Sequence, residues 1–211
     1  MADELGAEYL ELANAQYYSW ALLNRDQLMP SREQLRRAEA ITDEWKAKLA
    51  ERMRILFVVP DYHEGKPKKC MNGWGNVFLT ITPDGTALPC HTARMLPGLS
   101  FPNVRDSSLR EIWHESEGFN HYRGTGWMKQ PCRDCDKKEE DLGGCRCQAY
   151  LLAGDADATD PVCPKSPHYE IVSSALENAE FPARQVQPLI FRDPKESKRL
   201  IEETTASASG A

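Results

Sequence analysis

The sequence lacks the features that would place the protein in a membrane or on nucleic acid. No apolar run approaches the roughly 20 residues that a transmembrane helix needs. Residues 1–5 are acidic and lack the basic and then apolar pattern of a secretory signal. With 26 basic and 32 acidic residues, the chain also lacks the positive charge that phosphate binding favours. We therefore expect a cytoplasmic protein that binds neither membranes nor nucleic acid.

Cysteine is absent before residue 70, and the seven cysteines that follow are an odd number. They are Cys70, Cys90, Cys132, Cys135, Cys145, Cys147 and Cys163. A disulfide framework is typical of exported chains with an even number of cysteines. In a reducing cytosol, clustered cysteines more often bind metal or carry out redox chemistry. The short spacings Cys132-x2-Cys135 and Cys145-x-Cys147 favour a metal site over scattered buried thiols.

The first sixty residues have the pattern of an α/β fold. Leu5, Tyr9 and Leu12 recur at the spacing of one helix face, which predicts a helix there. The short, almost continuously apolar run at 17–23 predicts a strand that is covered on both sides.

A long helix and a second strand follow. Ser31 and Gln34 form the sequence pattern of a capping box, which predicts that the helix begins there. Its expected buried stripe consists of Leu35, Ala38, Ile41, Trp45 and Leu49. The apolar run at 54–59 predicts the second strand. Strand, helix and strand in this order form a βαβ unit with parallel strands.

Later segments are shorter and less regular. A β-rich run at 77–82 and a turn at 83–86 predict a hairpin that ends at Cys90. Ser108 and Glu111 predict a second capping box, and 169–176 predicts a last helix. Residues 128–165 are rich in Cys, Gly and Pro and poor in apolar periodicity, so we expect this segment to need metal or cross-links to fold. The small, polar tail from Glu202 predicts disorder.

Two kinds of metal site are compatible with these cysteines. A single zinc site that pairs Cys132 and Cys135 with Cys145 and Cys147 leaves the other three cysteines unexplained. Two iron–sulfur clusters use all seven thiolates if one other ligand joins them, and carboxylate or imidazole can replace thiolate on iron.

The spacing of the cysteines resembles the SPASM domain, the auxiliary-cluster extension of radical S-adenosylmethionine enzymes. The chain contains Cys70-x14-Gly85-x4-Cys90, then Cys132-x2-Cys135, then Cys145 and a distant Cys163. The family pattern places cysteines at the spacing Cys-x2-Cys-x5-Cys-x3-Cys in the middle block. In this sequence Asp141 stands at the third of these positions, and Cys147 is additional.

The resemblance implies two auxiliary clusters with defined ligands. Carried over by position, an outer [4Fe–4S] cluster takes Cys132, Cys135, Asp141 and Cys163, with Glu140 or a water as the alternative to Asp141. A [2Fe–2S] cluster takes Cys70, Cys90, Cys145 and Cys147, although a [4Fe–4S] cluster remains open for these four. The close pair at 145 and 147 fits two ligands on one iron.

Longer motifs resemble the PqqA peptide cyclases of pyrroloquinoline quinone (PQQ) biosynthesis. These motifs lie at 11–25 and 143–149, and the similarity extends from residue 3 to about 190. The resemblance implies a radical oxidoreductase that forms a carbon–carbon crosslink between a Glu and a Tyr of the precursor peptide PqqA. It also implies the peptide chaperone PqqD and an external reductant such as a flavodoxin as partners.

The Cys-x3-Cys-x2-Cys motif that holds the S-adenosylmethionine cluster is absent from this sequence. We therefore expect residues 1–62 to be the C-terminal part of a partial (β/α)6 radical barrel, and 63–180 to be an α+β SPASM domain. Residues 181–211 are then a C-terminal extension and tail. We expect such a chain to be inactive alone. The alternative is a stand-alone zinc or iron–sulfur module without catalysis.

Overall fold

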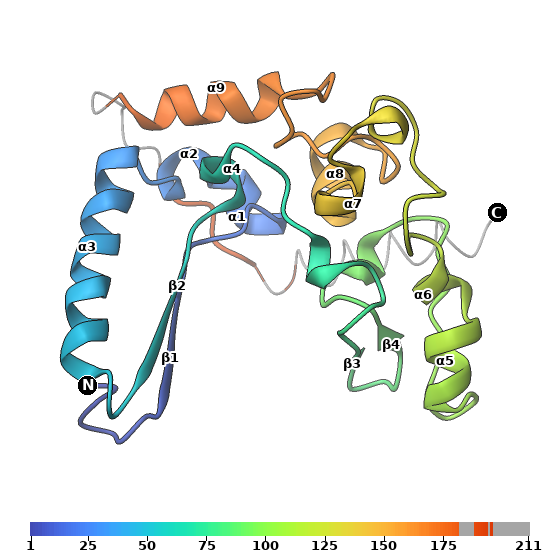
Figure 1. Cartoon of the computed structure of the whole chain (residues 1–211), viewed down its shortest axis with the longest axis horizontal. Helices are drawn as coiled ribbons and strands as arrows, with labels where there is room; N and C mark the ends of the chain where they lie inside the picture. Colours follow the sequence, from blue (N-terminus) through green and yellow to red (C-terminus); the bar gives the residue numbers. More distant parts are fainter. Residues whose placement is uncertain (182–187, 194, 196–211) are drawn as a thin grey trace. The chain divides into compact units, whose positions relative to one another are not determined.

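The computed structural model describes residues 1–181, 188–193 and 195, and it mixes helices with short strands (Figure 1). The elements in chain order are β1 (Tyr9–Ala13), α1 (Ser19–Leu23), α2 (Arg25–Leu28), α3 (Arg32–Leu49), β2 (Arg54–Val58), α4 (Asp61–Glu64), the 3-10 turn η1 (Cys70–Asn72), β3 (Thr80–Ile81), β4 (Ala87–Leu88), the 3-10 turn η2 (Ala93–Met95), α5 (Leu109–Glu115), α6 (Glu117–Asn120), the 3-10 turn η3 (Cys132–Asp134), α7 (Lys138–Asp141), α8 (Arg146–Ala153) and α9 (Glu170–Ala179).

The chain divides into two compact units. The first contains Met1–Val58 and Asn178–Ala211, and the second contains Val59–Glu177. The roles predicted for 1–62, 63–180 and 181–211 stay predictions, and the tail from Glu202 lies outside the described residues. No helix in the described part of the chain is both long enough and apolar enough to cross a membrane.

A βαβ unit forms the first unit's framework. Strands β1 and β2 pair in parallel, with Tyr9 opposite Arg54 and Ala13 opposite Val58. The connection between them contains α1, α2 and α3, and α3 lies alongside the strands (Figure 1). The predicted long helix and second strand are therefore confirmed. The predicted parallel pairing is present, but its first strand is Tyr9–Ala13 and not the predicted segment at 17–23. The predicted capping box is also present, because the Gln34 N–H donates to Ser31 Oγ at 3.2 Å and the Ser31 N–H donates to Gln34 Oε1 at 2.8 Å.

Two predictions at the N-terminus are wrong. Residues 9–13 form a strand instead of a helix, because pairing with β2 satisfies their backbone and Leu10 packs against the core beneath α3. Residues 19–23 form helix α1 instead of a strand, with the Ala21 N–H donating to the Tyr18 carbonyl at 2.9 Å. A short apolar run fits either structure, so its periodicity alone did not decide between them.

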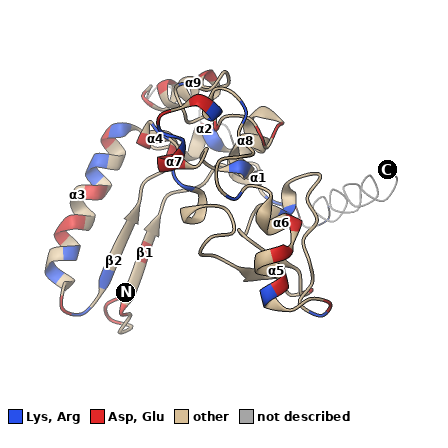
Figure 2. Ribbon diagram, turned by 45° about the vertical axis from the view of Figure 1, so that its right-hand side comes forward, with Lys and Arg blue, Asp and Glu red and all other residues tan. Residues whose placement is uncertain are grey.

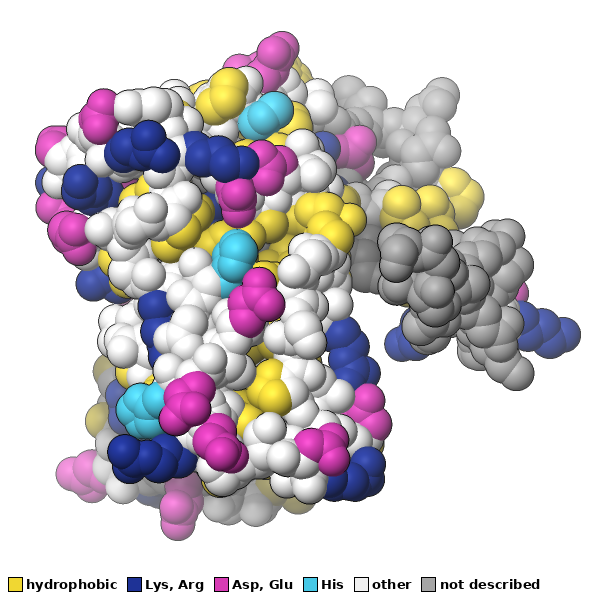
Figure 3. Space-filling model, turned by 90° about the vertical axis from the view of Figure 1, so that its right-hand side faces the viewer, with side chains coloured by type: hydrophobic (Ala, Val, Ile, Leu, Met, Phe, Trp, Pro, Cys, Tyr) yellow, Lys and Arg dark blue, Asp and Glu magenta, His cyan; other side chains and the backbone are white. Residues whose placement is uncertain are grey.

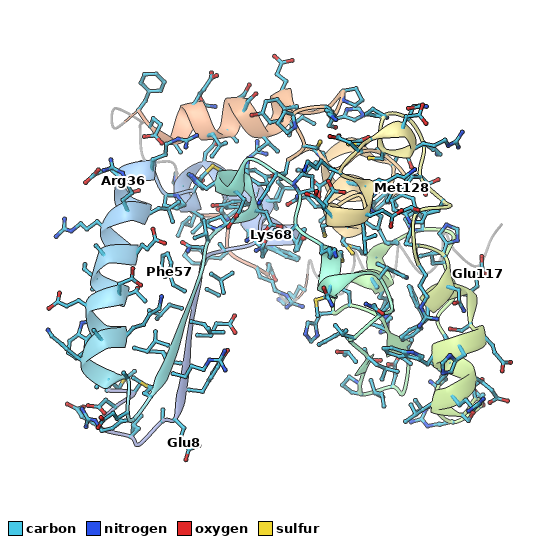
Figure 4. All side chains as sticks on the ribbon, viewed as in Figure 1. Glu8, Arg36, Phe57, Lys68, Glu117 and Met128 are labelled. Carbon is cyan, nitrogen blue, oxygen red and sulfur yellow. The ribbon has the colours of Figure 1, made fainter. Side chains whose placement is uncertain are left out.

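The buried stripe of α3 is narrower than predicted. Leu35, Thr42 and Leu49 are buried, whereas Ile41 and Trp45 are 49% and 48% exposed. A sheet of two strands covers only a narrow seam of a helix, which leaves the neighbouring apolar positions uncovered. Along its remaining surface α3 carries basic and acidic residues in mixed order (Figure 2), and Arg36 points away from the strands (Figure 4).

The second unit is built from short elements joined by long loops. Strands β3 and β4 form the predicted antiparallel hairpin, with Gly85 at φ +89° in its turn. The predicted Ser108–Glu111 capping box begins α5, and α9 confirms the last predicted helix. One face of the molecule shows hydrophobic side chains between scattered basic and acidic ones (Figure 3). With so little regular structure, the unit depends on side-chain contacts between its loops.

Candidate metal centre

Four cysteines from three separate segments come together in the second unit. The thiols of Cys70 and Cys147 each interact with the thiols of Cys145 and Cys90. The four thiols therefore close into a ring, which we call the thiol quartet. Among the described residues, no three or more His, Cys, Asp or Glu side chains form a site for a single metal ion.

Local backbone structure positions the quartet. Cys70 begins η1, where Met71 has a φ of +48° and turns the chain sharply. Cys90 lies two residues after the end of β4. Cys145 is the N-cap residue of α8 and Cys147 lies in its first turn, so one helix end supplies two of the thiols.

The quartet is surrounded by apolar side chains. Cys147 has no exposed surface and belongs to a buried cluster with Trp74, Ala93, Leu96 and Tyr122. Hydrogen bonds from the Cys147 and Cys70 thiols hold the pKa of Cys90 well below its usual range. Hydrogen bonds to Cys145 and Cys90, together with burial, raise the pKa values of Cys70 and Cys147. Metal binding at the quartet must displace the thiol protons.

A second group of donors lines one pocket. Cys132 begins η3, Cys135 follows that turn, Asp141 ends α7, and Cys163 comes from the loop before α9. We call these four residues the mixed group. Burial, and then the nearby charges of Cys132, Asp141 and Cys135, raise the pKa of Cys163.

Polar contacts hold the members of the mixed group. Cys132 Sγ lies 3.3 Å from Thr159 Oγ1, and Lys165 Nζ donates to Cys135 Sγ at 3.2 Å. The Gly143 N–H donates to Asp141 Oδ1 at 2.8 Å. The thiol quartet thus gathers four of the eight predicted ligands, and the other four line one pocket. Whether they bind metal stays a prediction.

One buried carboxylate that the sequence did not reveal connects the two groups. Asp160 is 1% exposed, and its Oδ2 accepts from the Cys145 N–H at 2.7 Å. Its Oδ1 accepts from Gln148 Nε2 at 2.8 Å and from the Val162 N–H at 3.0 Å. Burial raises the pKa of Asp160 to about 6. Asp160 therefore ties the segment of the thiol quartet to the segment that carries Cys163.

The guanidinium of Arg146 fixes the loops around these groups. It donates to the carbonyls of Ala156 at 2.9 Å and Ala158 at 2.8 Å, and to that of Gly143. Its carbon lies 4.6 Å from the ring centroid of Trp127. Arg146 stands between two quartet cysteines in the sequence, but its guanidinium hydrogen bonds to backbone carbonyls.

The donor chemistry of both groups fits iron–sulfur clusters, which thiolates and occasional carboxylates hold in partly buried loops. Residues 70–136 match the family model of SPASM, an iron–sulfur cluster-binding domain. We call this matched stretch the SPASM segment. This segment includes Cys70, Cys90, Cys132 and Cys135, and the other four donors follow it in sequence. The match therefore supports iron–sulfur cluster binding by this part of the chain.

Proposed function

We propose that the chain is the auxiliary-cluster portion of a radical S-adenosylmethionine enzyme of the PqqA peptide cyclase type. The proposal rests on the separation of eight donors into two groups of four. Each group contains two cysteines of the SPASM segment. Clusters bound at such groups accept and release single electrons.

The thiol quartet is assigned to a [2Fe–2S] cluster. Each iron of such a cluster takes two protein ligands, and Cys145 and Cys147 come as a pair from the first turn of α8. Cys70 and Cys90 form the other pair, and their thiols contact each other. Apolar side chains pack around Cys147, which has no exposed surface.

The mixed group is assigned to a [4Fe–4S] cluster with Asp141 as its one carboxylate ligand. Asp141 ends α7, and its Oδ1 already accepts the Gly143 N–H, which holds the carboxylate toward the pocket. Glu140 is the neighbouring carboxylate, but its Oε1 pairs with Lys137 at 2.8 Å. This pairing supports Asp141 over Glu140 as the ligand.

The first unit supports the remainder of the proposal. Its β1–α3–β2 arrangement is the repeating element of a partial (β/α)6 barrel, although one such element does not define a barrel. The sequence contains no Cys-x3-Cys-x2-Cys motif to hold S-adenosylmethionine. We therefore expect this chain to bind PqqA presented by PqqD, to take electrons from an external reductant such as a flavodoxin, and not to cleave S-adenosylmethionine alone.

Peptide binding tests the proposal. The anaerobically reconstituted chain is titrated with the PqqA–PqqD complex by calorimetry, with PqqD carrying a scrambled peptide as the control. We expect binding only with PqqA, and no 5′-deoxyadenosine when S-adenosylmethionine and a reductant are added. Equal binding of the scrambled peptide contradicts the assignment to PqqA. Zinc without sulfide in the purified chain favours the stand-alone zinc module instead.

A further inference from the structure

Lys165 stands out because it contacts one proposed ligand of the mixed group and lies two residues after another. Its Nζ donates to Cys135 Sγ at 3.2 Å, and Cys163 precedes it by two residues. The ammonium group also pairs with Asp136 Oδ1 at 3.3 Å. An ammonium group has three donors, so both side-chain contacts can form together.

The loop that carries Lys165 is held in place on both sides. The Cys163 N–H donates to the Asp160 carbonyl at 2.9 Å, and the Ser166 N–H donates to the Cys163 carbonyl at 2.8 Å. The buried hydroxyl of Ser166 donates to the Thr159 carbonyl at 3.0 Å. The backbone of Lys165 is therefore fixed beside the pocket, even though its side chain is 56% exposed.

A second lysine lines the same pocket but has a different partner. Lys138 Nζ donates to the Arg133 carbonyl at 3.0 Å. Lys138 therefore brings the same charge to the pocket without a contact to sulfur, which makes it the matched control for Lys165.

We propose that Lys165 sets the reduction potential of the cluster bound by the mixed group, through its contact with the Cys135 sulfur. This inference rests on the proposed function, because it requires a cluster at this site. Reduction adds negative charge to a cluster, and a cation or hydrogen bond at a ligand sulfur stabilises the reduced form. Loss of Lys165 therefore shifts the midpoint potential to more negative values.

The test is a potentiometric titration of the anaerobically reconstituted chain, followed by electron paramagnetic resonance. We expect Lys165→Met to shift the midpoint potential of this cluster downward, and Lys138→Met to shift it clearly less. Lys165→Gln keeps a donor and loses the charge, so we expect an intermediate shift. It also gives the decisive comparison if Lys165→Met does not retain its cluster.

The outcomes separate this inference from the proposed function. Full iron and sulfide content with equal shifts in Lys165→Met and Lys138→Met overturns a specific role for Lys165, because a general change of charge then explains both. An unchanged potential in Lys165→Met and Lys165→Gln also overturns it. Absence of a cluster at the mixed group in the unmodified chain refutes the proposed function itself.

Discussion

Gly144 is the residue at which a single added methyl group should do the most damage to both donor groups. Its φ is +76°, a conformation that costs a residue with a Cβ about 1–2 kcal/mol. A Cβ built there lies 2.7 Å from the Asp160 Cβ and 2.8 Å from the Pro67 Cβ, and it also contacts Asp160 Oδ2. The clash therefore falls on the carboxylate that holds the Cys145 N–H.

Gly154 offers a matched control in the same unit. Its φ is +74°, nearly the same as that of Gly144, but a Cβ built there meets nothing within 4 Å. We expect Gly154→Ala to lower the free energy of unfolding by only the backbone contribution of about 1–2 kcal/mol. Overpacking adds about 1–3 kcal/mol, so Gly144→Ala should lower it by about 2–5 kcal/mol.

Urea unfolding of the reduced, metal-free variants measures both changes under anaerobic conditions. Iron per chain after reconstitution gives a second measurement. We expect it to fall in Gly144→Ala and to stay at the level of the unmodified chain in Gly154→Ala. Equal losses of stability in the two variants, or full iron loading of Gly144→Ala, refute the reasoning that Asp160 and Gly144 together position the ligand segments.

Three further changes have expected outcomes. Asp160→Asn turns one oxygen acceptor into a donor that faces a buried N–H, so it should lower the free energy of unfolding by about 1–3 kcal/mol and reduce iron loading. Hydrogen bonds from Thr82 and then Arg94 lower the pKa of Asp84. The ionised Asp84 carboxylate therefore stabilises the folded chain above pH about 4, and this stabilisation is lost as the pH falls through the lowered pKa. The difference in urea midpoint between Asp84→Asn and the unmodified chain should accordingly be constant near neutral pH and shrink in acid. A difference that grows in acid contradicts this role of the Asp84 carboxylate. Chelation of the metal should lower the Tm of the reconstituted chain. It should also expose residues 128–165 to proteolysis first, because that segment lacks a periodic apolar core. Uniform cleavage along the chain would contradict this expectation.

Several local features were predictable because neighbouring residues determine them. The capping boxes at Ser31 and Ser108 each need one polar side chain and one partner three residues later, and both form as predicted. The turn around Gly85 follows from the same kind of local chemistry. Residues 9–13 and 17–23 were not predictable in this way, because pairing with β2 decided the first and a short apolar run fits either structure.

The grouping of the cysteines needed more than their spacing. Cys145 and Cys147 are close in sequence, but only the folded chain brings Cys70 and Cys90 to them. Asp141 became a candidate through the register of a family pattern, since an acid beside Glu139 and Glu140 has no distinguishing feature of its own. Asp160 gave no signal, because its role depends on N–H groups and an amide from residues 145–162 that converge only in three dimensions.

The most direct test of the two-cluster account is the amount of iron, zinc and acid-labile sulfide per chain after anaerobic preparation. One [2Fe–2S] and one [4Fe–4S] cluster predict about six iron and about six sulfide per chain. Asp141→Ala should lose only the signal of the [4Fe–4S] cluster, whereas Glu140→Ala should keep both clusters. About eight iron contradicts the [2Fe–2S] assignment of the thiol quartet. About one zinc per chain without sulfide contradicts the account as a whole.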